Sequence, residues 1–283
     1  MTEDPARTDP ARTDVNRPGP DIGWMSAFGS GDPVTLFGHG FSGAIRDTRP
    51  FASGIAGTRV LVSLGGHGGR PSPGPGWTYG TIAEQLAAAL ESSRATRALG
   101  VSMSAGGLAR LITAGHPAAT GLEKVAFVLP ASWAGFTPEV RAAHAAHVEA
   151  IRAHLAAGDR TALLDALLAR EPAAVAELPP ARAWAAAKVD ALFDTDMSDG
   201  VGLALDIAVA DPARALEAAG AFAGEVLVLT HEDDRSHPVS VARDYAAAFP
   251  HASLEVLPAG SILWRGRSEV RRILRAFFDD EET

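Results

Sequence analysis

The chain has 283 residues, of which 47% are hydrophobic and 21% charged, a balance typical of a globular protein with one large core. The formal net charge is −9 with scattered arginines, which excludes nucleic acid as an expected partner. The absence of cysteine excludes disulfides, thiolate metal sites and cysteine nucleophiles. Neither a secretory leader nor an apolar run of about 18 residues is found, so we expect a cytoplasmic protein with no membrane partner.

The first 22 residues differ in character from the rest of the chain. The pentapeptide Asp-Pro-Ala-Arg-Thr occurs at residues 4–8 and again at 9–13, and prolines continue to Pro20. Such a segment buries too little apolar surface to offset the entropy lost on ordering. We therefore predict a disordered N-terminal tail over residues 1–22.

From residue 33 onward, short apolar runs alternate with amphipathic stretches. The apolar runs predict strands at 34–37, 59–64, 98–101, 125–129, 226–230 and 254–257. The amphipathic stretches predict helices at 78–91, from 105 onward, at 238–248 and at 269–278. This alternation indicates the α/β class, with a mainly parallel sheet covered by helices on both faces.

The stretch from 131 to 221 is helical in character and contains no convincing strand. We predict that it forms a helical lid, inserted into a core made of residues 23–130 and 222–283. Ligands of open α/β sheets bind beyond the carboxyl ends of the strands, where such a lid would cover them.

A turn of small residues, Gly100-Val101-Ser102-Met103-Ser104, joins a predicted strand to a predicted helix. This order is typical of a nucleophile elbow, in which a tight turn lifts the central serine above the sheet edge. Ser104 replaces the second glycine of the usual Gly-x-Ser-x-Gly pattern. We predict Ser102 as the nucleophile; the alternative is a turn that only packs a helix on a strand.

A glycine-rich loop, Gly38–Gly43, follows the first predicted strand. A loop here can give a backbone N–H to an oxyanion hole, and the amide after the nucleophile gives the second. Phe41 and Met103 are the predicted donors. We also expect His39, Gly40 and Phe41 to contact a ligand, although an ordinary strand-exit turn is the alternative.

A polar segment, Thr230–Pro238, follows a buried strand and opens a helix. A carboxylate at such a strand end is typical of the acid in a catalytic triad. Asp234 is the candidate and Asp233 the alternative, and a carboxylate here would equally suit a helix N-cap.

Four segments resemble the motifs of the α/β-hydrolase superfamily in order and spacing, over about residues 33–280: Phe37–Gly40, Gly65–Gly68, Gly100–Gly107 and Asp234–Pro238. The resemblance implies the α/β-hydrolase fold, with Ser102 as nucleophile and Asp234 as acid. The family's histidine position falls on Ser261, so the implied triad is incomplete. We therefore expect an atypical member of the superfamily.

The first functional hypothesis is non-hydrolytic proton transfer. An unpaired Asp234 under a lid would have a raised pKa and could abstract a proton next to a carbonyl. The reaction would be an epimerisation, isomerisation or cyclisation of a carbonyl-containing metabolite or peptide in bacterial natural-product biosynthesis. The superfamily offers a precedent in the bottromycin epimerase, whose triad is also broken.

Two further hypotheses remain open. A serine hydrolase of the esterase, thioesterase or amidase kind would need a relocated histidine base, for which His39, His231 and His237 are candidates and His237 leads. A catalytically silent ligand-binding protein would use neither Ser102 nor Asp234 in turnover.

The remaining predictions concern the ligand. We expect Ser104, Trp133, Ser261 and Trp264 to line the pocket around a small-molecule or peptide substrate; for the two tryptophans, packing of the lid onto the core is the alternative. No nucleotide or flavin fingerprint is present, so no cofactor is expected. His144, His147 and His154 share a helix face, but no carboxylate accompanies them at matching spacing, so we predict a solvated face and no metal. The sequence leaves the oligomeric state open.

Overall fold

The computed structural model describes residues 24–279, so the tail predicted at residues 1–22 lies outside the described residues. A seven-stranded sheet in the order β1-β3-β2-β4-β5-β6-β7 runs through the molecule, and only the edge strand β1 is antiparallel to its neighbour. The strands are β1 (Met25–Phe28), β2 (Val34–Gly38), β3 (Thr58–Val62), β4 (Arg97–Val101), β5 (Lys124–Val128), β6 (Glu225–His231) and β7 (Ala252–Leu257).

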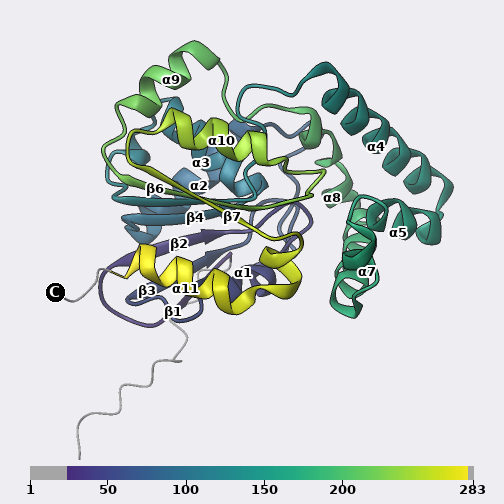
Figure 1. The fold of residues 1–283 in the computed structure, drawn as a ribbon, viewed down its shortest axis with the longest axis horizontal. Helices are drawn as coiled ribbons and strands as arrows, with labels where there is room; N and C mark the ends of the chain where they lie inside the picture. The colour runs from purple at the N-terminus through teal and green to yellow at the C-terminus, as the bar shows by residue number, and fades with distance from the viewer. Residues whose placement is uncertain (1–23, 280–283) are drawn as a thin grey trace, which may run out of the picture.

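Helices cover both faces of this sheet (Figure 1). Helices α2, α3, α9 and α10 lie over one face, and α1 and α11 lie over the other. Their bounds are α1 (Ile45–Ala52), α2 (Tyr79–Ser93), α3 (Met103–Thr113), α9 (Pro212–Gly220), α10 (Val239–Ala248) and α11 (Arg267–Phe278), with short helical turns η1 (Pro117–Ala119) and η3 (Ser261–Arg265). Because successive strand side chains alternate between two covered faces, the strands read as continuous apolar runs.

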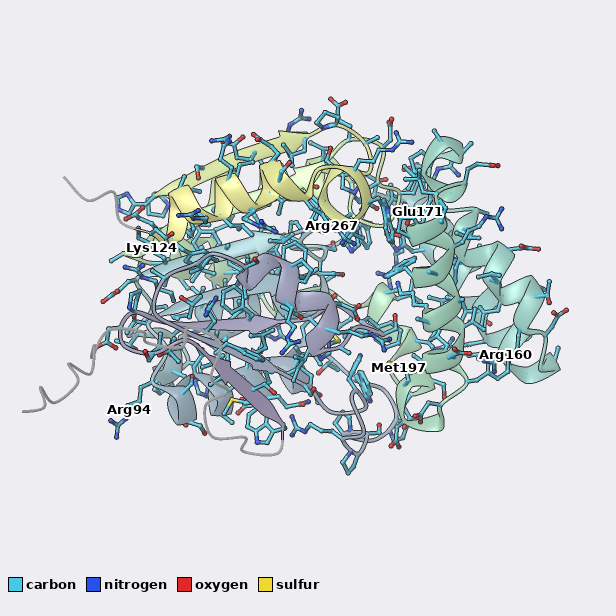
Figure 2. All side chains as sticks on the ribbon, turned by 90° about the horizontal axis from the view of Figure 1, so that it is seen from below. Arg94, Lys124, Arg160, Glu171, Met197 and Arg267 are labelled. Carbon is cyan, nitrogen blue, oxygen red and sulfur yellow. The ribbon has the colours of Figure 1, made fainter. Side chains whose placement is uncertain are left out.

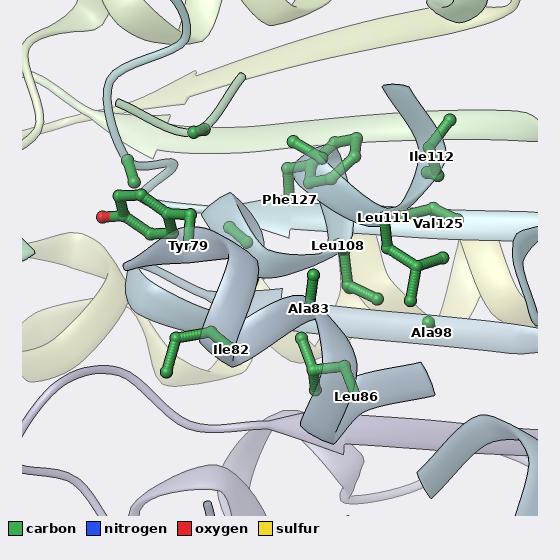
Figure 3. Packing of buried hydrophobic residues seen from close by; sticks show 14 of the residues in the cluster. Tyr79, Ile82, Ala83, Leu86, Ala98, Leu108, Leu111, Ile112, Val125 and Phe127 are labelled. Atoms are coloured by element: carbon green, nitrogen blue, oxygen red, sulfur yellow. The ribbon is translucent and has the colours of Figure 1, made fainter. Parts of the chain in front are cut away.

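The larger core cluster lies between the sheet and helices α2 and α3 (Figure 3). Ile82 and Leu86 of α2 and Leu108 of α3 belong to this cluster, and all three are fully buried. Gly107 permits this close approach, because a Cβ there would lie 2.6 Å from Ile82. The core thereby holds the start of α3, and the turn before it, in a fixed place.

The predicted α/β class is confirmed, and each predicted strand and helix has a counterpart within a few residues. The sequence analysis missed β1 and α1. Strand β1 has only four residues, and helix α1 contains Pro50, which interrupts the usual helical pattern. Among the helices of residues 24–279, none has the length and hydropathy needed to cross a bilayer.

The chain between β5 and β6, which we call the insertion (residues 131–221), is helical. Besides α9 it contains α4 (Pro138–Ala157), α5 (Arg160–Leu168), α6 (Ala173–Ala176), α7 (Pro179–Leu192), α8 (Thr195–Ser198) and η2 (Val201–Leu205). Helices α4, α5 and α7 project beyond one end of the sheet (Figure 1) around an apolar cluster of their own, whereas α9 packs on α3. Figure 2 shows Glu171 on the side of the insertion nearest the core and Arg160 at its outer end.

Candidate active site

Ser102 lies in a sharp turn between β4 and α3. Its backbone has φ 49° and ψ −102°, a conformation that residues other than glycine rarely adopt. The turn is tight enough that a Cβ on Gly100 would lie 2.5 Å from the amide nitrogen of Ala105. The amide of Ser102 donates to the carbonyl of Val128 on the neighbouring strand at 2.9 Å. The surrounding structure therefore maintains the strained backbone that the elbow pattern predicts.

Ser104, which was predicted to contact a ligand, is fully buried and does not line the cavity described below. Its hydroxyl donates instead to the carbonyl of His39 at 2.6 Å. Gly38 provides the space, because a Cβ there would lie 2.5 Å from the hydroxyl oxygen of Ser104. The serine that replaces the second glycine of the motif thus ties the elbow to the glycine-rich loop, and the prediction of a ligand contact is wrong.

The imidazole of His237 lies between Ser102 and Asp234. Its Nε2 is 2.8 Å from the Oγ of Ser102, and its Nδ1 is 2.9 Å from Oδ2 of Asp234. A carboxylate only accepts, so Nδ1–H donates to Asp234 and leaves Nε2 free to accept the serine proton. The arrangement has the order and distances of a nucleophile, a base and an orienting acid.

The loop between β6 and α10 brings acid and histidine together within three residues of chain. Oδ1 of Asp234 accepts from the amides of Ser236 at 2.7 Å and His237 at 2.9 Å, which folds the loop back on the carboxylate. Pro238 then caps α10 in an extended conformation. This local turn, rather than a distant strand end, supplies the imidazole.

The prediction that Asp234 is unpaired with a raised pKa is wrong. Burial does disfavour the charged carboxylate, but the charge and hydrogen bonds of His237 outweigh it. His231, with Nε2 at 3.7 Å from the same carboxylate, adds to that effect. The pKa of Asp234 therefore lies well below its ordinary value, and the group is an ionised partner for His237.

Two buried histidines hold the glycine-rich loop. Nε2 of His39 accepts the amide proton of Leu64 at 3.1 Å, and Nε2 of His67 accepts that of Ser42 at 3.1 Å. Their Nδ1 atoms lie 2.8 and 2.9 Å from the carbonyls of Gly40 and Gly65. Burial lowers the pKa of His39 to about 4 and that of His67 to about 3, so both rings are neutral and keep their acceptor nitrogens near pH 7.

This loop places Phe41 beside the elbow. Phe41 and Met103 both line the cavity that contains Ser102. Met103 is the first residue of α3, so its amide has no acceptor within the helix. Phe41 and Met103 therefore border the same space as Ser102, and His39 and Gly40 line the same cavity.

A cavity of about 230 Å³ lies between the carboxyl ends of the strands and the insertion. Ser102, Asp234 and His237 line its core side, and much of the remaining wall is apolar. The insertion contributes apolar residues such as Val148 and Leu192, together with several ionisable side chains. A wall of this kind suits a ligand whose bulk is mostly apolar.

No family model and no curated protein matches the chain. Solved structures do, over nearly the whole chain. An α/β hydrolase from a Medee basin deep-sea metagenome library, MGS-M2, has TM-score 0.73 and 12% identity and covers 92% of this chain and 95% of its own. An esterase from Exiguobacterium antarcticum has TM-score 0.70 and 17% identity, and the match covers 90% of this chain and 95% of the esterase. The enol-lactonase from Burkholderia xenovorans LB400 has TM-score 0.66 and 18% identity, and the match covers 88% of this chain and 94% of the lactonase.

The chain has the α/β-hydrolase fold. At these identities the likeness establishes the arrangement of strands and helices alone.

Within the α/β-hydrolase fold, the position after β7 where the resemblance places a histidine is Ser261. This residue is buried at the start of η3 and does not line the cavity, so the predicted ligand contact is wrong. A Cβ on Gly266 would lie 2.9 Å from the Cβ of Ser261, so the glycine at 266 permits the close packing of this turn. Ser261 packs a turn, and His237 takes the place beside Ser102.

The two predicted tryptophan contacts are also wrong. Trp133 is buried against Tyr245, with ring centroids 5.0 Å apart, in the core under α10. Trp264 packs edge-on against Trp184 of the insertion at 5.3 Å. Neither Trp133 nor Trp264 lines the cavity, and each instead packs against another aromatic ring.

The prediction of a solvated histidine face on α4 is wrong for two of its three members. His144 is buried and stacks on Phe136 at 4.4 Å, and His147 lines the cavity. Burial lowers the pKa of His144 and brings that of His147 to about 4, so both are neutral near pH 7. Among residues 24–279, no group of three or more histidine and acidic side chains is placed to hold a metal ion.

Arg170, just after α5, was not predicted and connects the insertion to the histidine loop. Its Nη2 donates to the carbonyl of Arg235 at 2.7 Å, and its Nε donates to Oγ of Ser236 at 3.1 Å. These are the two residues that precede His237. Motif analysis had no signal for Arg170, because its function depends on a contact between segments 65 residues apart.

Proposed function

We propose that this protein is a serine hydrolase that cleaves an ester, thioester or amide through an acyl-Ser102 intermediate. The observation that supports this most strongly is the 2.8 Å separation between Oγ of Ser102 and Nε2 of His237. It supplies the base whose absence had favoured a non-hydrolytic reaction.

The proposed reaction follows from the geometry. Oγ of Ser102 attacks the carbonyl carbon while its proton passes to Nε2 of His237, and Asp234 stabilises the resulting imidazolium. The backbone amides of Phe41 and Met103 bind the oxyanion. Collapse of the intermediate breaks the bond to the leaving group, which takes the proton from His237. Water, deprotonated by the same nitrogen, then releases the acid and regenerates Ser102.

The size and lining of the cavity support a small-molecule substrate whose acyl chain is mostly apolar. A volume of about 230 Å³ between core and insertion suits a short chain better than an extended peptide. The proposed steps use only groups of this chain and require no cofactor.

One mechanism remains for the non-hydrolytic hypothesis. Asp234 is paired, so an epimerisation or isomerisation would have to use His237 as the base toward a C–H bond. No observation favours that route over attack by Ser102, whose hydroxyl is already within hydrogen-bond distance of the imidazole.

A fluorophosphonate probe, read by intact mass, tests the proposal. We expect one adduct on the wild-type protein, none on Ser102→Ala, and labelling slowed by orders of magnitude in His237→Ala. Ser261→Ala is the matched control, because this serine is buried outside the cavity, and it should label at the wild-type rate.

Absence of an adduct at high probe concentration would refute the serine-hydrolase proposal. Deuterium incorporation at carbon in candidate metabolites would then identify proton transfer, and tight binding without any product would identify a ligand-binding protein.

A further inference from the structure

Lys188 lies on the face of α7 that lines the cavity. Trp184, Lys188 and Leu192 follow one another at intervals of four residues, and all three contribute to the cavity wall. That spacing places them on one side of a helix. The lysine is half-buried, and its amine sits 4.1 Å from the centroid of the Trp184 ring.

The amine of Lys188 has no polar partner among residues 24–279: no carboxylate oxygen lies within 4.0 Å and no acceptor is hydrogen-bonded to it. Three carboxylates face it from a greater distance, those of Asp47, Glu171 and Asp234, together with the guanidinium of Arg170. Asp234 is engaged by His237, and Asp47 accepts from the amide of Ala44 at 2.8 Å. Only Glu171 remains as a possible internal counterion.

A cation in a cavity wall that has an aromatic ring beside it, but no carboxylate or hydrogen-bond acceptor, stabilises the fold less than a paired one. Removing an ammonium group from water is costly unless a carboxylate or hydrogen-bond acceptor replaces the lost hydration. A methionine or leucine at this position would complete the apolar face that Trp184 and Leu192 begin. Burial lowers the pKa of Lys188 to about 8, so the amine is mostly charged near pH 7 and has three protons to donate.

We propose that Lys188 binds a carboxylate at the far end of the substrate's acyl group, so that the substrate class is a monoester or monothioester of a dicarboxylic acid. This inference rests on the proposed function, which it makes more specific. The acyl group remains in the cavity while the leaving group departs, so a fixed cation in the wall would anchor the part of the substrate that stays. Glu171 competes for the same amine until the carboxylate arrives.

The kinetic test compares matched pairs of nitrophenyl esters. Hemisuccinate, hemiglutarate and hemiadipate esters are each paired with the neutral ester of equal chain length, and the ratio of kcat/KM within a pair is measured. We expect the wild-type enzyme to favour the acidic ester at one chain length. Lys188→Met should lower that ratio roughly tenfold or more, mainly through KM, because a charge-assisted hydrogen bond is lost.

Glu171→Gln distinguishes a binding cation from a structural one. If Lys188 binds the substrate carboxylate, removing the competing Glu171 carboxylate should raise the ratio. If Lys188 serves only to neutralise Glu171, Lys188→Met should lower stability without changing the ratio, and Glu171→Gln should restore that stability. The second pattern would overturn the proposal.

A binding experiment separates this inference from the proposed function. The chain has two lysines, Lys124 and Lys188, so reductive methylation with ¹³C gives one NMR signal for each beside that of the N-terminal amine. In Ser102→Ala, glutarate should shift the Lys188 signal and raise its pKa, whereas the Lys124 signal should not respond. If glutarate shifts the Lys188 signal but the fluorophosphonate probe does not label wild-type Ser102, the serine-hydrolase proposal is refuted and the carboxylate site stands.

If the probe labels Ser102 but glutarate leaves the Lys188 signal unchanged and the enzyme shows no preference for acidic esters, the carboxylate site is refuted and the serine-hydrolase proposal stands.

Discussion

The two sides of the cavity differ in how their polar groups are satisfied. On the core side, the ring nitrogens of His39 and His67 are both engaged with backbone groups, and Asp234 is bonded to His237. On the insertion side, the side chains of Lys188 and Glu171 have no hydrogen bond or ion pair among residues 24–279. The hydrogen bonds on the core side hold Ser102, His237 and Asp234 in place before a substrate binds. The charged groups of Lys188 and Glu171, which have no hydrogen bond or ion pair in the described part of the chain, remain available to a ligand.

Arg170 is the exception to that division, because it belongs to the insertion but bonds to the loop that carries His237. The predictions below test whether chemistry resides on the core side and how far the insertion contributes to it.

The largest effect should come from His237→Ala on the core side. Loss of the imidazole removes the proton acceptor for Ser102, and loss of a triad member costs roughly 10⁴-fold or more in kcat. Steady-state hydrolysis of a neutral nitrophenyl ester measures it. An effect below about tenfold would mean that His237 does not act as the base.

Arg170→Ala should have the next largest effect, from the insertion side. Without its bonds to Arg235 and Ser236 the histidine loop is less firmly placed, and misplacement of a catalytic group by about 1 Å can cost on the order of 100-fold. We expect kcat to fall roughly tenfold to a hundredfold with a smaller change in KM, and Arg170→Lys to recover part of the loss. Arg182→Ala, an exposed arginine of the same insertion, is the matched control. Equal effects of the two alanine variants would refute a positioning role for Arg170.

Gly38→Ala tests the contact between the glycine-rich loop and the elbow. The added methyl group would overlap the hydroxyl of Ser104, and overpacking of this kind costs about 1–3 kcal/mol. Urea unfolding should show that loss, and Ser104→Gly in the same chain should recover most of it. If the double variant is no more stable than Gly38→Ala, the two residues are not coupled in the way the contact implies.

The last effect, similar in size to that of Gly38→Ala, concerns the stability that Asp234 contributes as pH changes. Its pKa is lower in the folded chain than in the unfolded chain, so its contribution is present above the unfolded value of about 3.9 and is lost as pH falls toward the folded value. Asp234→Asn should therefore be less stable than wild type by about 2 kcal/mol near pH 7. Urea titrations between pH 7 and pH 3 should show the gap narrowing at the acid end. A gap that does not change with pH would contradict the ionised pair.

On the core side, the sequence predicted which segments border the cavity, because the patterns that mark these segments are local. The turn at Ser102 and the loop at Gly38–Gly43 come at or directly after the ends of strands and have glycines where the chain packs closely, and Asp234 lies three residues after β6. His237 could be named as a candidate, but its distance from Ser102 depends on how two loops meet across β5 and β6, and no local pattern encodes that.

The insertion side was predicted poorly for the same reason. Helical periodicity identified helices but not which face meets the cavity, so His147 was assigned to solvent and Arg170 and Lys188 were not singled out. Size and aromatic character suggested pocket roles for Trp133 and Trp264, which pack between layers instead. One signal was available for Lys188: it is one of two lysines in the chain, and it lies in line with Trp184 and Leu192.

The most direct test of the account is chemical rescue of His237→Ala by free imidazole, followed through the rate of fluorophosphonate labelling. If His237 is the base for Ser102, added imidazole should enter the space left by the side chain and restore labelling in His237→Ala, but not in His237→Ala combined with Ser102→Ala. Labelling of His237→Ala at the wild-type rate without imidazole would show that Ser102 is activated by another group, and the proposed relay would be wrong.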